Sequence, residues 1–353
     1  MFTSIISFIF VFFIVALAHE GGHYYFAKKA GIRVVEAGFG FGPTLFSFVK
    51  NNTKYSLNLI PILAYVNLAG IDEIDEKDKL GNIIPENEKY YNKKTFQKFL
   101  SIVAGPLCNI ILAVFIVYIL VIFAGMPIEK GNQIANIMPN SQAQKAGLLV
   151  GDSIISINGV KTDKVSEIIN KIYNNADKDL DIKLLRNNKI IDIHATPKYD
   201  STKKIGLLGI MLNPIVEYKK SNPIDSLWIS VSEVGNMVIV IAKLLAKLFM
   251  GQIPLTSLAG PVGIAQISGQ VAHQGVLQLF WFTALLSVNL GVANLIPIPA
   301  LDGGRLVFIA IEYIRGKAID IKKENQIHYI GLMILLGFML ILTIIDVRRI
   351  FGL

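Results

Sequence analysis

The sequence predicts a polytopic α-helical membrane protein with about four transmembrane helices, a membrane-associated β-hairpin segment and one inserted α+β domain. Of its 353 residues, 53% are hydrophobic and 17% charged, whereas soluble domains carry about 25% charged residues. The uncharged residues gather in a few runs close to the roughly 20 residues that a helix needs to cross a bilayer core. Charges return at ordinary density within residues 129–220. We therefore expect three domains, at 1–128, 129–220 and 221–353.

The first uncharged run, residues 1–18, consists mainly of Phe, Ile and Val. A secretory signal peptide is the alternative, because Ala16-Leu17-Ala18 looks like a small-residue cleavage site. However, the first Lys or Arg is Lys28, so the run lacks the basic start of a signal peptide. We expect a transmembrane helix.

Residues 32–69 form an apolar segment that is too interrupted to cross the membrane as a helix. Apolar and polar side chains alternate from Tyr55 to Leu59, and Asn51-Asn52 indicates a turn. A β-hairpin close to the membrane is expected, with protein or a water-filled cavity covering its backbone.

Three further spans are predicted at Phe99–Ile128, Phe280–Ile296 and Tyr329–Ile345. Residues 70–98 are polar and form a predicted loop. Charged residues interrupt the apolar stretch 222–250, which favours an amphipathic helix lying at the membrane interface, with a tilted span as the alternative.

Four spans place both chain ends and the 129–220 domain on one side of the membrane. Basic residues flank the spans on the other side, which is therefore expected to be cytoplasmic. The net charge of +8 reflects this topology, and no nucleic-acid partner is expected. The single cysteine, Cys108, excludes an internal disulfide and a Cys-based metal site. The basic residues that flank the spans on the side expected to be cytoplasmic are Lys28, Lys29, Arg33, Lys93, Lys94, Lys98, Arg315 and Lys317.

Residues His19-Glu20-Gly21-Gly22-His23 form the H-E-x-x-H pattern of zinc proteases. Residues i and i+4 share one face of a helix, so both imidazoles can reach one ion. Glu20 can take a proton from water bound to that ion. The pattern also occurs by chance, but an ionisable cluster at the end of an apolar helix is costly in lipid and indicates function.

A catalytic zinc ion has three protein ligands and one open position. Asp302 is the best candidate for the third ligand, because it is the only acidic residue between Glu233 and Glu312 and follows an apolar run. The alternative is that Asp302 only caps the helix that starts near Gly303.

Three asparagines, Asn109, Asn289 and Asn294, lie within the predicted spans. Amides in hydrocarbon need hydrogen-bond partners. These three side chains either bind substrate backbone or contact the surroundings of the metal-bound water, or they join helices to one another.

Within the inserted domain, the segments Pro139–Leu148 and Gly151–Gly159 carry a strand–turn pattern that resembles a PDZ domain. PDZ domains hold extended peptides at a sheet edge. A folded spacer without a ligand is the alternative.

Three ordered motifs resemble those of the site-2 protease family of intramembrane zinc metalloproteases. They are His19-Glu20-x-x-His23, Gly105-Pro106-x-x-Asn109 and Asn294-x-x-Pro297-x-Pro299-x-Leu301-Asp302-Gly303. With the PDZ-like segment between the second and third motifs, the chain is similar to the bacterial regulator-of-sigma-E protease branch. It has room for one PDZ domain, whereas the best-known member of that branch has two.

The resemblance implies zinc held by His19, His23 and Asp302, with Glu20 as the catalytic base. Asn109, Asn289 and Asn294 would position the substrate or stabilise the transition state. Residues 55–69 resemble the family's membrane-associated strand, which clamps the substrate in extended form.

The expected function is hydrolysis within the transmembrane segment of a membrane protein, such as an anti-sigma factor or a remnant signal peptide, after an earlier cut. The expected location is the inner (plasma) membrane, in contact with lipid, with the active site toward the cytoplasm and the PDZ-like domain outside. A non-enzymatic membrane PDZ scaffold is the alternative. A transporter is disfavoured because no inverted repeat is present.

Overall fold

The computed structural model describes residues 2–71, 81–162, 164–201 and 204–351. The chain forms two compact units, of which one combines Met1–Ile122 with Asn222–Leu353 and the other is Phe123–Ser221. The two segments on either side of the insertion thus fold together as one unit. Part of the predicted loop at 70–98, namely residues 72–80, lies outside the described residues.

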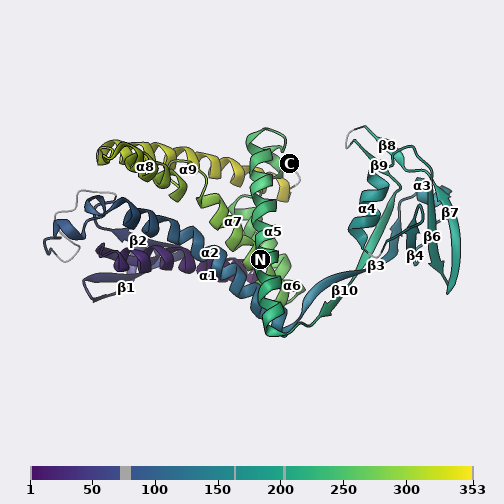
Figure 1. Cartoon of the computed structure of the whole chain (residues 1–353), viewed down its shortest axis with the longest axis horizontal. Coiled ribbons are helices and arrows are strands. Elements are labelled where there is room, and N and C mark those ends of the chain that lie inside the picture. Colours follow the sequence, from purple (N-terminus) through teal and green to yellow (C-terminus); the bar gives the residue numbers. More distant parts are fainter. Residues whose placement is uncertain (1, 72–80, 163, 202–203, 352–353) are drawn as a thin grey trace. The chain divides into compact units, whose positions relative to one another are not determined.

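The first unit is mainly helical (Figure 1). Five of its helices are long and apolar enough to cross a membrane, namely α1, α2, α5, α7 and α9. This confirms the predicted polytopic helical class. By length and composition, α5, the helix expected at the interface, also qualifies as a possible span. The helices are α1 (Phe2–Lys29), α2 (Thr95–Phe123), α5 (Pro223–Phe249), α6 (Pro261–Gln274), α7 (Val276–Asn294), α8 (Asp302–Arg315) and α9 (Ile321–Phe351), with short 3-10 turns at Glu86–Glu88, Tyr90–Asn92 and Leu255–Ser257.

The predicted span Phe99–Ile128 was wrong at its carboxyl end, because helix α2 stops at Phe123 and strand β3 begins at Met126. Gly125 separates them with a φ of 91°, a left-handed conformation that glycine adopts without steric cost. The absence of charge cannot mark this change, since a short apolar run suits a helix and a strand equally well.

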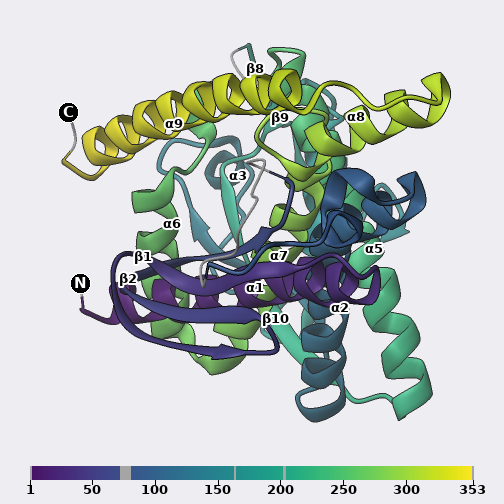
Figure 2. The same cartoon turned by 90° about the vertical axis from the view of Figure 1, so that its left-hand side faces the viewer.

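Strands β1 (Val34–Lys50) and β2 (Thr53–Leu68) confirm the predicted β segment. The turn between them has φ values of 51° and 58° at Asn51 and Asn52. Residues 36–39 pair with two stretches of β2, residues 54–57 and residues 64–67, so the strands form a folded sheet rather than a simple hairpin. This sheet lies along α1 (Figure 2).

The second unit confirms the predicted α+β insertion. Its main sheet has the strand order β10-β3-β4-β6-β7, with β5 paired to β4, and β8 and β9 form a separate pair. The elements are β3 (Met126–Ile137), α3 (Gln142–Lys145), β4 (Ser153–Ile157), β5 (Val160–Lys161), α4 (Val165–Tyr173), β6 (Leu180–Arg186), β7 (Lys189–Ala195), β8 (Lys198–Asp200), β9 (Ile205–Leu207) and β10 (Ile210–Lys219).

The core of this unit consists mainly of aliphatic side chains between the main sheet and helix α4. Ile154 of β4, Ile168 of α4 and Ile182 of β6 are all fully buried within it. Removing such side chains from water contributes about 1.5–3 kcal/mol each. The sheet and the helix are therefore joined by apolar packing.

A partly buried ion pair also stabilises this unit. Both carboxylate oxygens of Asp152 accept from Arg186, Oδ1 from Nε at 2.7 Å and Oδ2 from Nη2 at 2.7 Å, and Oδ2 also accepts the Leu149 N–H at 2.8 Å. Burial opposes ionisation of Asp152, but the guanidinium and this N–H outweigh it and hold the pKa of the carboxyl below its usual range.

We expect Asp152→Asn to destabilise the second unit at neutral pH by roughly 1–2 kcal/mol, the cost of weakening a partly buried, charge-assisted hydrogen bond. Because the folded-state pKa is lowered, the carboxylate's contribution is present above the unfolded value of about 3.9 and is lost as pH falls through the lowered folded-state value. Pulse proteolysis of the full protein in urea should therefore separate wild type from variant near pH 7 and less near pH 3.

The control for this experiment is Asp192→Asn. It removes an exposed carboxylate whose Oδ1 lies 3.7 Å from Lys183 Nζ. Exposed pairs contribute little, so its unfolding midpoint should match wild type at both pH values. Equal effects of the two substitutions would contradict the assignment.

Candidate metal centre

Helix α1 carries His19, Glu20 and His23 in its carboxyl-terminal part, continuous with the apolar run that precedes them. The two imidazoles lie one turn apart on the same face, and their Nε2 atoms are 3.2 Å from each other. Asp302, in the first turn of α8, places Oδ2 at 3.1 Å from His19 Nε2 and 3.3 Å from His23 Nε2. The structure thus brings together the three predicted ligands from distant parts of the chain.

The spacing of these three atoms fits a zinc ion. Ligands about 2.0–2.1 Å from zinc in a tetrahedron are separated by about 3.3–3.4 Å, close to the observed 3.1–3.3 Å. Asp302 Oδ2 is buried and accepts no hydrogen bond within the part of the chain that the structure describes. Two nitrogens and one oxygen are also ligand types that zinc prefers.

The alternative role of Asp302, capping a helix, does not match the geometry. Leu301 occupies the N-cap position of α8, and no side chain caps that end. Asp302 is the first helical residue, and its carboxylate is directed to the histidines instead.

His23 is held in place by helix α2. Its Nδ1 lies 2.8 Å from the carbonyl oxygen of Ser101, and donation to that carbonyl leaves Nε2 free to bind a metal. A Cβ at Gly105 would overlap the His23 ring, and a Cβ at Gly22 would overlap the Ala104 carbonyl. These two glycines therefore allow the close approach of α1 and α2.

Sequence reasoning missed Ser101, because every residue offers a backbone carbonyl and nothing in the sequence marks this one. It found Gly105 as part of a motif, but the reason for the glycine is visible only once the ring of His23 is placed.

Asn109 is fully buried, and its Nδ2 lies 3.3 Å from His19 Nδ1. Its Oδ1 has no hydrogen-bond partner among the described residues. Amide nitrogen and oxygen are assigned from such contacts, and turning the amide over would let Oδ1 accept the His19 Nδ1–H. That arrangement is the one a zinc-bound His19 requires, so the position of Asn109 favours orientation of a ligand.

Asn289 and Asn294 lie on α7, the first exposed and the second half-buried. In the described part of the chain, neither is hydrogen-bonded to His19, His23 or Asp302. Helix α7 itself packs next to Asn109, since Ser287 Oγ donates to the Asn109 carbonyl at 2.8 Å. The structure therefore places α7 near the metal centre without joining these two amides to the three described ligands.

A cavity of about 450 Å³ lies between α1 and the β1–β2 sheet, beside Glu20. Its walls are mostly apolar and aromatic, and the Tyr24 and Tyr55 hydroxyls are hydrogen-bonded to each other at 2.6 Å. Among its lining residues are Gly21, Gly38, Phe39, Phe46, Phe48 and Tyr65.

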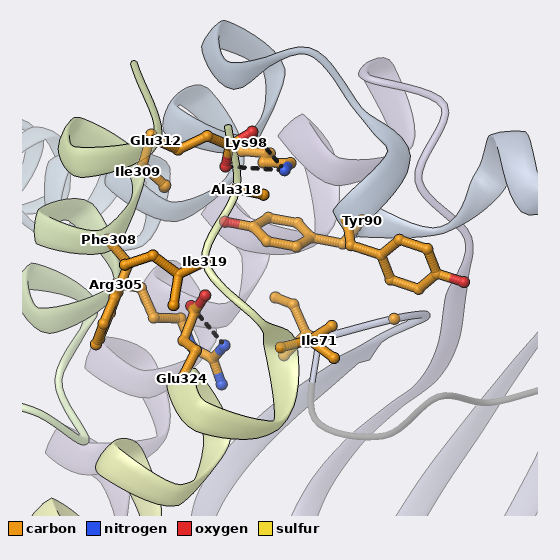
Figure 3. Close-up of a pocket in the computed structure, with 13 residues that line it drawn as sticks. Ile71, Tyr90, Lys98, Arg305, Phe308, Ile309, Glu312, Ala318, Ile319 and Glu324 are labelled. Carbon is orange, nitrogen blue, oxygen red and sulfur yellow. Dashed lines mark hydrogen bonds and ion pairs between the residues drawn. The ribbon is translucent and has the colours of Figure 1, made fainter. Parts of the chain in front are cut away.

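A second, much smaller cavity of about 30 Å³ is lined by α8, α2 and the start of α9, together with Ile71 and Tyr90 (Figure 3). Lys98 Nζ on α2 contacts both carboxylate oxygens of Glu312 on α8, at 2.9 and 3.0 Å. Arg305 Nη1 on α8 lies 3.9 Å from Glu324 Oε1 on α9. These ion pairs connect α8, which begins with Asp302, to both neighbouring helices.

Comparison with known proteins gives a family match over most of the chain. Residues 7–338 match the model described as Peptidase family M50. A Geobacillus kaustophilus protein named Zinc metalloprotease RasP is 32% identical, with 99% of this chain and 98% of that protein covered. A Bacillus subtilis protein named Regulator of sigma-W protease RasP is also 32% identical, with 99% of each chain covered.

Among solved structures, the PDZ domain of an SdrC-like protein from Listeria innocua is similar to part of the chain, at 21% identity and a TM-score of 0.22. The match covers 24% of this chain and 93% of that domain.

Proposed function

The chain belongs to Peptidase family M50, and from that premise we propose that His19, His23 and Asp302 hold its zinc ion and that Glu20 is the catalytic base. The chain is a zinc metalloprotease, as the sequence predicts. The observation that carries the residue assignment is the convergence of two imidazole nitrogens and one carboxylate oxygen within 3.1–3.3 Å of one another.

The chemistry required is hydrolysis of a peptide bond inside a membrane protein. Zinc, when bound, polarises the scissile carbonyl and lowers the pKa of a bound water. Glu20, next to His19 in α1, takes a proton from the attacking water and delivers it to the leaving nitrogen. The Ser101 carbonyl and Asn109 keep the two imidazoles in the orientation that ligation needs.

The substrate is a transmembrane segment of another membrane protein in extended form. A peptide bond within a helix is shielded by the helix's own hydrogen bonds, so the segment must unwind before it is cut. The cavity beside Glu20, with its aromatic walls and adjoining β strands, suits an unwound apolar segment. One relative is named a regulator of sigma-W protease, which supports an anti-sigma factor as the substrate; a remnant signal peptide is the alternative. In both cases we expect an earlier cut to shorten the substrate.

The protein is a multi-pass membrane protein, and we place its metal centre toward the cytoplasm. The basic residues that flank α1, α2 and α8 support this orientation. With α5 at the interface, as its charges at Lys243 and Lys247 favour, four helices cross and the second unit lies outside the cell.

Cleavage by the purified protein in lipid vesicles tests the proposal. A single-span substrate with a shortened outer part should be cut within its apolar segment, and a zinc chelator should stop the reaction. A membrane PDZ scaffold would bind no zinc and cut nothing, so a metal-free, inactive but folded protein would contradict the proposal.

Gly21→Leu should block the substrate cavity without disturbing the fold. Gly21 lines the cavity, and a Cβ there meets no atom within 4 Å, so the leucine would project into space that the substrate needs. We expect cleavage to fall about 100-fold, the effect of misplacing a substrate by about 1 Å, while zinc content stays at the wild-type level.

Gly337→Leu is the matched control, since Gly337 is an exposed glycine of α9 that also has no atom within 4 Å of a built Cβ. It should cut at the wild-type rate. Equal activity of the two leucine variants would show that the substrate does not occupy this cavity.

A further inference from the structure

The backbone that leads into Asp302 is held in an unusual conformation. Ala300, two residues earlier, has a φ of 80°, in the left-handed region that favours glycine and disfavours residues with a Cβ. Such a conformation persists only where the surroundings hold it in place.

Helix α9 supplies the contacts that hold it. His328 is buried, with 8% of its surface exposed, and its Nδ1 accepts the N–H of Ala300 at 3.0 Å. One turn further along α9, a Cβ at Gly331 would overlap the backbone carbonyl of Pro299. The helix thus contacts two consecutive residues of the loop through a specific hydrogen bond and a close packing contact.

The loop and the start of α8 form one closely packed body. A Cβ at Gly303 would overlap the Ile296 carbonyl, and one at Gly304 would meet the Ile298 carbonyl. A shift at Ala300 therefore cannot be absorbed before Asp302 and must move its carboxylate relative to His19 and His23.

We propose that His328 is a positioning residue for the metal centre: its hydrogen bond to Ala300 fixes the loop conformation that brings Asp302 to the two histidines. The inference rests on the proposed ligand set. Packing alone does not account for the residue, since a buried imidazole is costly unless its polar atoms are used.

The test compares His328→Asn with His328→Leu. The asparagine Oδ1 is separated from Cα by the same number of bonds as the histidine Nδ1, so it can accept the Ala300 N–H, whereas leucine fills space without an acceptor. We expect the metal affinity of the leucine variant, measured by competition with a chelator, to be roughly 10–100-fold lower than that of wild type. This is the usual effect of removing an outer partner of a ligand. The asparagine variant should stay within about 3-fold of wild type.

Two readouts do not depend on activity. In cobalt-substituted protein, the visible absorption bands should change in the leucine variant and be preserved in the asparagine variant. In metal-free protein, hydrogen exchange at residues 295–301 should be faster with leucine only. Tyr329→Leu, at the neighbouring exposed position, is the control and should match wild type.

If the leucine variant does not fold, His328→Leu combined with Ala300→Gly replaces it, because glycine adopts the observed φ without strain. Without the acceptor, this double variant should still bind metal more weakly than His328→Asn combined with Ala300→Gly. A leucine variant with wild-type metal retention and spectrum, or an asparagine variant as impaired as the leucine variant, overturns the inference. Absence of zinc from wild type would instead overturn the proposed function.

Discussion

Glu20→Gln should leave the protein folded and loaded with zinc but unable to cut. Glutamine has nearly the same shape as glutamate, yet its amide cannot take a proton from the attacking water. Loss of a general base typically lowers the rate by roughly 10²–10⁴-fold. Single-turnover cleavage of a transmembrane substrate in vesicles, with zinc measured on the same sample, gives both quantities.

Glu233→Gln makes the same chemical change on α5 and should be fully active. If Glu20→Gln retained wild-type cleavage, Glu20 would not be the base; if it lost zinc as well as activity, its role would be structural.

Asp302→Ala should have the second large effect, the loss of the metal itself. It removes one of three ligands and leaves two histidines one turn apart, so zinc affinity should fall by more than the roughly 100-fold typical of an outer-shell change. Competition with a chromophoric chelator measures this affinity directly. Asp320→Ala, at an exposed position before α9, is the control. Zinc binding as tight as wild type in Asp302→Ala would exclude this residue from the ligand set.

The sequence predicts those site residues whose side chains belong to a recognisable motif. The spacing of His19 and His23 places both on one helix face, and the isolation of Asp302 in an apolar stretch marks it as unusual. Their approach to within 3.3 Å depends on tertiary packing, which no local pattern encodes.

Other parts of the site have no sequence signal. The Ser101 carbonyl that orients His23 is a backbone group, and Ala300 is a residue type that rarely has a positive φ. His328 lies just before the predicted span Tyr329–Ile345, in a segment expected to be a polar loop, whereas helix α9 begins at Ile321; its link to the metal centre was therefore not expected. The sequence identified the candidate ligands, and the structure adds what orients them.

The membrane helices show a similar division. Runs of uncharged residues located α1, α2, α7 and α9, but the end of α2 was misplaced because apolar residues continue from the helix into β3. Helix α5 was assigned to the interface from its charges, although it is long and apolar enough to cross. Hydropathy thus finds apolar segments but does not distinguish every helix from a strand, or a span from an interfacial helix.

X-ray absorption at the zinc edge of the purified protein tests the central claim most directly. The account predicts two imidazole nitrogens and carboxylate or water oxygens at about 2.0–2.2 Å, with one imidazole lost in His23→Ala. A zinc environment without imidazole, or one left unchanged by both His23→Ala and Asp302→Ala, would contradict it.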